Sequence, residues 1–168
     1  MSTLLIKNID VLVTMDDKRH EHHHTNLYCE TGFIKAIGSA ESLPKSADKV
    51  VDLSGHIVFP GLINTHHHFY QTLTRALPAA QNANLFHWLV TLYPIWARLT
   101  PDDIRISTQT TLAELARSGC TTASDHLYLF PTGSRRDDEI EPAPEVGLRL
   151  HASRGSMSLG ESQGGLPP

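Results

Sequence analysis

Three consecutive histidines, His66, His67 and His68, are the residues of this sequence whose type and spacing point most directly to chemistry. They close an apolar stretch at residues 62–66 that follows a Pro60-Gly61 break and has the composition of a buried strand. Because side chains alternate along a strand, His66 and His68 would share one side and His67 would face the other. Paired imidazoles at a strand end can bind one metal ion such as zinc. The sequence therefore predicts a metal site at His66 and His68; the alternative is a chance triplet on a surface loop.

A second histidine cluster, at His20 and residues 22–24, lies between stretches that are expected to form strands. We expect an exposed polar loop there, with adventitious metal binding as the alternative. The chain has two cysteines, Cys29 and Cys120, too few for a disulfide framework. We expect both to be small buried residues and not nucleophiles, which fits a reducing compartment.

The segment before the histidines, residues 1–59, is predicted to be β structure. Short apolar runs alternate there with the turn signals Thr31-Gly32 and Ser54-Gly55. This pattern predicts a small β-sandwich or half-barrel, of which residues 1–59 supply the N-terminal half. Strands this short bury little surface alone, so a packing partner is expected.

After Pro60 the pattern changes to strands that alternate with helices, which predicts an α/β fold with a parallel sheet. Apolar residues at three- and four-residue steps predict a helix over 84–98, which Pro94 should kink or end. A second helix is predicted to begin at Thr100-Pro101 and to end at Gly119. Pro142 and Pro144 predict a short or broken helix between 135 and 147. Strands are expected at 62–66, 121–126 and 147–153.

The length of this second part allows three strand–helix units, whereas a complete (β/α)8 TIM barrel takes about 250 residues. Residues 60–168 are therefore expected to be the first three βα units of a truncated barrel. Expressed alone, residues 1–168 are expected neither to fold stably nor to be active, because the opposing strands would be missing.

Composition excludes several classes of function. A net charge of −4 without a basic block argues against a nucleic-acid partner. No apolar stretch approaches the roughly 18 residues of a membrane helix, and the N-terminal run lacks the features of a signal peptide. We therefore expect a cytoplasmic protein that uses neither nucleic acid nor a membrane.

The segment from Pro60 to Gln71 resembles the signature of the amidohydrolase superfamily, in which Pro-Gly-(Leu/Phe)-(Ile/Val)-(Asn/Asp)-x-His-x-His ends the first strand of a metal-dependent barrel. The stretches 66–75, 120–126 and 153–161 are similar to the 8-oxoguanine deaminase branch, and nearly as similar to the chlorotriazine and hydroxytriazine hydrolases. The resemblance covers nearly the whole chain and also fits a sandwich before the barrel.

The resemblance implies one Zn²⁺ per complete active site, with His66 and His68 as its first two ligands. A third histidine, an aspartate, and the glutamate and histidine that move protons are expected beyond Pro168, so no catalytic residue is assigned within this chain. The implied reaction is hydrolytic deamination of an aromatic amino-heterocycle, with 8-oxoguanine giving urate and ammonia. When full length, the protein is expected to be a homo-oligomer.

Four further residues are candidates for substrate binding. Gln71 is the first choice from the resemblance, since its amide could read a purine edge, although it could equally be a capping or surface residue. Trp88 could stack on a flat heterocycle, but its helical spacing also fits the core. His126 and Arg154 end successive strands at the same edge of the sheet and could support the site or have ordinary structural roles.

Two alternatives remain open at this stage. The same superfamily includes triazine hydrolases, which would release an amine or chloride from a triazine in place of ammonia from a purine. A non-catalytic barrel fragment with a binding role is the alternative of a different class.

Overall fold

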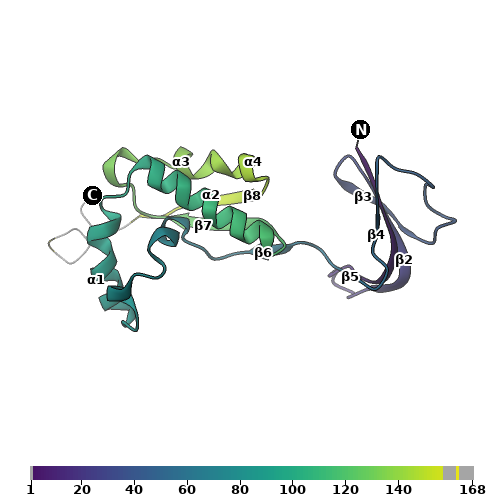
Figure 1. The fold of residues 1–168 in the computed structure, drawn as a ribbon, viewed down its shortest axis with the longest axis horizontal. Helices are drawn as coiled ribbons and strands as arrows, with labels where there is room; N and C mark the ends of the chain where they lie inside the picture. The colour runs from purple at the N-terminus through teal and green to yellow at the C-terminus, as the bar shows by residue number, and fades with distance from the viewer. Residues whose placement is uncertain (1, 157–161, 163–168) are drawn as a thin grey trace. The chain divides into compact units, whose positions relative to one another are not determined.

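The computed structural model describes residues 2–156 and Ser162, and it divides into two compact units, residues 1–60 and 61–168 (Figure 1). Each unit is described by itself. Within the described residues, no helix has both the length and the apolar character that crossing a membrane requires.

The first unit contains one five-stranded sheet. Its strands are β1 (Thr3–Val13), β2 (Glu21–Glu30), β3 (Phe33–Gly38), β4 (Lys49–Asp52) and β5 (Ile57–Val58). The order is β3-β2-β1-β4, with β5 also beside β1; β1, β2 and β3 form an antiparallel meander, and β4 and β5 run parallel to β1. The sheet is the strand layer that the sequence predicted, while a second layer of a sandwich stays a prediction.

The turns of this sheet follow the sequence signals. Thr31 and Gly32 join β2 to β3 with φ of +49° and +82°, the left-handed pair that a two-residue hairpin needs. Ser54-Gly55 also makes a turn, but the strands on either side of it, β4 and β5, each pair with β1 and not with each other.

The expected exposed loop is confirmed at His20, which precedes β2, but was wrong for residues 22–24. Residues 21–24 are the first part of β2, where His22 lies opposite Leu12 and His23 opposite Val11. Their side chains are exposed, as expected of a polar run. Backbone pairing with the apolar strand β1 decides the conformation here, because hydrogen bonding to a neighbouring strand does not require an apolar side chain on the open face.

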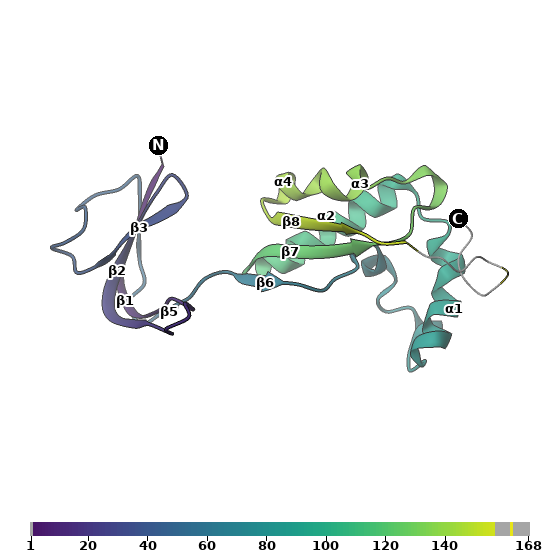
Figure 2. The same cartoon turned by 180° about the vertical axis from the view of Figure 1, so that it is seen from behind.

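The second unit is mixed α/β, with three parallel strands in the order β6-β7-β8. The strands are β6 (Leu62–Asn64), β7 (Cys120–Leu127) and β8 (Arg149–Arg154), and the helices α2 (Pro101–Arg117), α3 (Asp137–Ile140) and α4 (Pro142–Val146) lie along one face of the sheet (Figures 1 and 2). The helix α1 (Leu85–Trp96) and the 3-10 turns η1 (Phe69–Thr74), η2 (Pro78–Ala80) and η3 (Pro131–Gly133) complete the unit.

Two apolar clusters hold this unit together. One surrounds Trp96, which is fully buried and donates its indole Nε1–H to Thr74 Oγ1 at 3.0 Å. The other joins Phe69 of η1, Leu112 of α2 and Ala123 of β7. The second cluster places the turn that follows the histidines directly against the helix layer.

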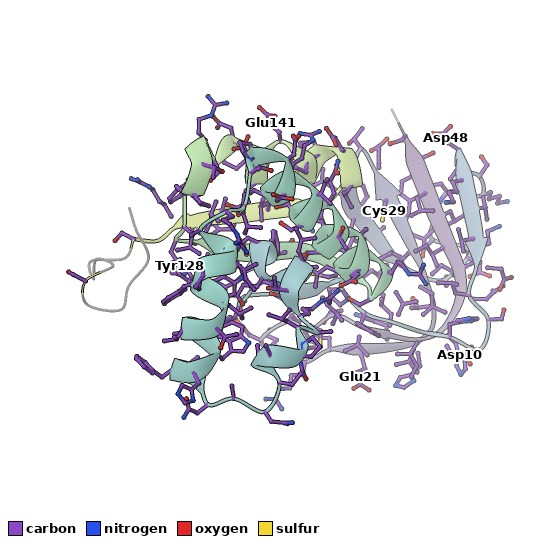
Figure 3. The ribbon with its side chains drawn as sticks, turned by 60° about the vertical axis from the view of Figure 1, so that its left-hand side comes forward. Asp10, Glu21, Cys29, Asp48, Tyr128 and Glu141 are labelled. Atoms are coloured by element: carbon purple, nitrogen blue, oxygen red, sulfur yellow. The ribbon has the colours of Figure 1, made fainter. Side chains whose placement is uncertain are left out.

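Local signals in the helices are confirmed, and one strand is shorter than expected. Asn84 caps α1 by accepting from His87 N–H, and α1 ends two residues after Pro94. The helix expected between 135 and 147 is broken at Glu141 into α3 and α4 (Glu141 is labelled in Figure 3). The strand expected over 62–66 ends at Asn64, so the histidines lie just beyond it.

The N-terminus of α2 gives a first testable prediction. Thr100 Oγ1 accepts from Asp103 N–H at 3.2 Å while the Asp103 carboxylate accepts from Thr100 N–H at 2.8 Å, a reciprocal capping box. Thr100→Ala should lower the free energy of unfolding of the intact protein by about 1 kcal/mol, measured by urea denaturation. Thr100→Ser, which keeps the hydroxyl, should cost less than half as much; equal losses would show that the cap contributes nothing.

Candidate metal centre

A cavity of about 240 Å³ lies at the carboxyl ends of β6, β7 and β8. It is lined by residues 65–68, by residues 124–126 and by Ser153. In parallel α/β folds this edge of the sheet is where binding sites form, because the strand ends leave loops and side chains free to converge. The structure thus brings His66, His68 and His126 to one cavity.

The His66 and His68 rings are placed as a metal-binding pair would be. Their centroids are 5.4 Å apart and their planes are nearly perpendicular, at 87°. Two imidazoles that bind one tetrahedral ion through nitrogens at about 2.0–2.1 Å have centroids roughly 5 Å apart. The separation of the two rings therefore matches that of two histidines on one such ion.

The tautomer of His68 is set by its hydrogen bond. Its Nδ1 lies 2.8 Å from the carbonyl oxygen of His126, and a carbonyl can only accept, so Nδ1 carries the proton. The lone pair is then on Nε2, which is the form that binds a metal. Histidine ligands typically donate their second nitrogen in this way.

His67 has a different role from its neighbours. Its Nδ1 accepts from the backbone N–H of His68 at 2.9 Å, and its ring lies 5.1 Å from that of Phe69. Burial, and secondly the charge of His68, lower the pKa of His67. A neutral, half-buried ring that accepts from its own backbone is a structural element of the turn.

Two buried carboxyl groups lie at the base of the cavity. Asp125, which lines it, is 1% exposed, and its Oδ1 accepts from Phe69 N–H at 2.6 Å. Glu139 of α3 is also 1% exposed, and its carboxyl group is a hydrogen-bond partner of the Asp125 carboxyl. Burial raises the pKa of Glu139, and the nearby Asp125 carboxyl raises it further, against the opposing charge of Arg136.

A third protein ligand is not part of the described site. Among residues 2–156 and Ser162, no group of three or more His, Cys, Asp or Glu side chains could hold a metal ion. Catalytic zinc usually keeps three protein ligands. The donor set present, two imidazoles of which one has a fixed tautomer, fits part of a zinc site.

Residues 57–165 match the amidohydrolase family, and they include the histidine segment and all three parallel strands. The chain belongs to the amidohydrolase family.

Two curated relatives of this chain are a deaminase and an ethylaminohydrolase. The chain is 51% identical over 137 residues to an 8-oxoguanine deaminase of Pseudomonas aeruginosa, an alignment that covers 80% of this chain and 30% of that protein. It is 34% identical to a hydroxydechloroatrazine ethylaminohydrolase of Pseudomonas sp., over 100% of this chain and 38% of that protein. The chain thus spans about a third of the length of the relatives it matches.

Solved structures agree with this assignment. A triazine hydrolase from Arthrobacter aurescens superposes with a TM-score of 0.86 at 32% identity, over 96% of this chain and 37% of that one. An atrazine chlorohydrolase from the same species, complexed with zinc, has a TM-score of 0.84 at 33% identity, over 98% of this chain and 38% of that one.

The other sequence-predicted residues of the amidohydrolase lie at different distances from the cavity. His126 lines it, with its ring centroid 5.6 Å from that of His68. Gln71 lies in η1, where its amide donates to Tyr70 Oη at 3.1 Å. Trp88 packs on Trp96 with ring centroids 5.2 Å apart, and Arg154 places its guanidinium 5.3 Å from the centre of the Phe130 ring. Substrate-binding roles for these four residues stay predictions.

Sequence reasoning missed Tyr128 and the buried acids. Tyr128 follows β7, and its ring centroid lies 5.5 Å from that of His68 (Tyr128 is labelled in Figure 3). Asp125 carried a usable signal, because a carboxylate within an expected buried strand requires a partner. Glu139 carried none, since it sits in an acidic run at 137–139 that looks solvent-exposed.

The buried Glu139 should make the stability of the protein depend on pH. In the native state its pKa is raised above the ordinary value of 4.5, so the folded protein retains a proton that the unfolded chain has lost. The free energy of unfolding therefore falls as the pH rises from about 4.5 to about 8, by at most about 1.4 kcal/mol per pH unit. Glu139→Gln, which cannot ionise, should show a smaller fall in urea midpoint between about pH 5.5 and about pH 7.5. An unchanged slope would mean that Glu139 ionises freely in the native state.

Proposed function

We propose that this chain supplies part of the active site of a zinc-dependent hydrolytic deaminase, with 8-oxoguanine as its substrate. The observation that carries the proposal is the His66–His68 pair at the strand ends, with the Nε2 lone pair of His68 available for a metal. The deaminase relative at 51% identity supports the choice of substrate.

The described residues would bind and orient the reacting groups. A zinc ion at His66 and His68 would supply hydroxide at neutral pH for attack on the amino-bearing ring carbon. Overall, water replaces the amino group of 8-oxoguanine, and urate and ammonia are formed. The carbonyl of His126 would hold the ring of His68 in its orientation, and no group that moves protons is assigned among the described residues.

Substrate contacts by four side chains are also part of the proposal. Gln71 would contact the edge of the heterocycle, Trp88 would stack on it, and His126 and Arg154 would complete the surroundings at the strand ends. The support differs among them, because only His126 lines the described cavity.

The fold of the whole domain is also a proposal. Residues 60–168 would form the first three βα units of a (β/α)8 barrel, and residues 1–59 would form half of a sandwich. The three parallel strands in sequential order and the superposition on much longer amidohydrolase chains support this reading. Assembly as a homo-oligomer and a cytoplasmic location complete the proposal.

A triazine substrate is the second candidate. It is favoured by the solved structures, since triazine hydrolases superpose over nearly the whole chain. In that case the same site would release an alkylamine or chloride from a triazine ring, and the two histidines would have the same role.

Turnover and metal content test the proposal. The intact protein, as its gene encodes it, would be purified without chelators, its zinc measured by elemental analysis, and ammonia release measured with 8-oxoguanine, guanine and a hydroxytriazine. We expect one zinc per chain and the highest kcat/KM with 8-oxoguanine. A higher kcat/KM with the hydroxytriazine would show that a triazine, and not 8-oxoguanine, is the substrate. A metal content well below one equivalent would overturn the zinc mechanism in favour of a non-catalytic binding role.

A further inference from the structure

The segment that carries the two candidate ligands lies outside regular pairing. Strand β6 ends at Asn64, two residues before His66. The chain then passes through His66, His67 and His68 into the 3-10 turn η1, which begins at Phe69. Contacts other than the β6–β7 strand pairing must therefore hold His68 in place.

Three hydrogen bonds from two adjacent residues of β7 hold this segment. The N–H of His126 donates to the carbonyl of His67 at 3.1 Å. The carbonyl of His126 accepts from His68 Nδ1 at 2.8 Å. The carboxylate of Asp125 accepts from Phe69 N–H at 2.6 Å.

These three bonds differ in what they require of the sequence. Both bonds of His126 use its backbone, so any residue except proline could make them at that position. The bond of Asp125 uses a side chain, and therefore depends on the identity of the residue. Asp125 and Leu127 are both buried, with Ala123 in line on the same strand, and an apolar side chain would be the ordinary choice on that face.

Burial of the ionisable side chain of Asp125 lowers the stability of the folded state unless its contacts offset that loss. Asp125 is 1% exposed, and apart from Phe69 N–H its side chain meets the equally buried carboxyl group of Glu139, which raises the number of ionisable groups placed out of water to two. Phe69, whose N–H donates to Asp125, is itself 1% exposed, so the bond cannot be replaced by one to bulk water.

We propose that Asp125 is a positioning residue for the metal-binding segment, which it fixes through the backbone N–H of Phe69. The peptide unit that joins His68 to Phe69 is then held on one side by Asp125, while the ring of His68 is held on the other by the carbonyl of His126. His68 is thereby fixed at both its backbone and its ring, which keeps its Nε2 beside His66. This inference rests on the proposed metal site.

The test compares zinc affinity in variants of the intact protein. Asp125→Ala should raise the zinc Kd, measured by competition with a chromophoric chelator, by about 10–100-fold, as for other residues that support metal ligands. Asp125→Asn should lie between this variant and the wild type, because its amide oxygen can still accept from Phe69 N–H. The d–d absorption of the Co²⁺-substituted protein should shift in Asp125→Ala, since that spectrum reports ligand geometry.

Leu127→Ala is the matched control. Leu127 is buried on the same strand, and its side chain has no polar atom that could bond to the histidine segment. It should lower thermal stability at least as much as Asp125→Ala while leaving the zinc Kd within about twofold of wild type. A wild-type Kd in Asp125→Ala, or an equal loss in Leu127→Ala, would overturn the positioning role and leave the metal site standing. A wild-type protein that binds no zinc would overturn both.

Discussion

His66→Ala and His68→Ala should each remove zinc from the intact protein and reduce deamination to background, whereas His67→Ala should retain the metal. The His66 and His68 rings lie 5.4 Å apart, whereas the His67 ring accepts from the backbone N–H of His68 and lies against Phe69, although His67 also lines the cavity. Loss of a residue that only supports a ligand typically costs about 10–100-fold in affinity, so loss of a ligand should cost more than about 100-fold. Elemental analysis and ammonia release measure the two effects.

The control for this experiment is that each variant still folds. All three variants should keep the circular dichroism spectrum of the wild type, since none of the three side chains is fully buried. His67→Ala should lose some thermal stability because the N–H of His68 loses its acceptor. Equal metal loss in all three variants would contradict the assignment of His66 and His68 as a pair.

Trp96→Ala should produce the largest loss of stability of any single substitution considered. Trp96 is fully buried, lies 5.2 Å from the rings of both Tyr70 and Trp88, and donates to Thr74 Oγ1. Truncation of a buried tryptophan costs about 3–5 kcal/mol, because a large cavity remains. Urea denaturation of the intact protein would give the change in the free energy of unfolding.

Trp96→Phe is the milder substitution at the same position. It keeps a six-membered aromatic ring but loses the pyrrole part of the indole with the Nε1–H that Thr74 accepts, so it should cost about 1–2 kcal/mol, less than the alanine variant. If Trp96→Ala cost no more than Trp96→Phe, the cluster around Trp96 would not be the core of this unit.

Local chemistry explains which elements the sequence predicted well. The start of α2 at Pro101 follows from Thr100 and Asp103, which are three residues apart, and its end follows from Gly119 with φ of +87°. The hairpin at Thr31-Gly32 is likewise a property of two adjacent residues. In each case the residues that decide the conformation are neighbours in the chain.

Features that depend on distant partners were not predictable in this way. The first part of β2, at residues 21–24, is a strand because β1 pairs with it. Asp125 and Phe69 are separated by 56 positions, so no local pattern signals their hydrogen bond. Alternation did place His66 and His68 on one side, although β6 ends at Asn64; the bonds from His126 keep the segment extended beyond the ladder.

The order of the parallel strands has a consequence for how the site is made. Neighbours in this sheet are also neighbours in the chain: β6 pairs with β7, and β7 pairs with β8. The histidine segment and the strand that holds it are both complete once residue 127 has been synthesised. All three hydrogen bonds that place His68 therefore join segments that precede β8 in the chain, and β8 supplies none of them.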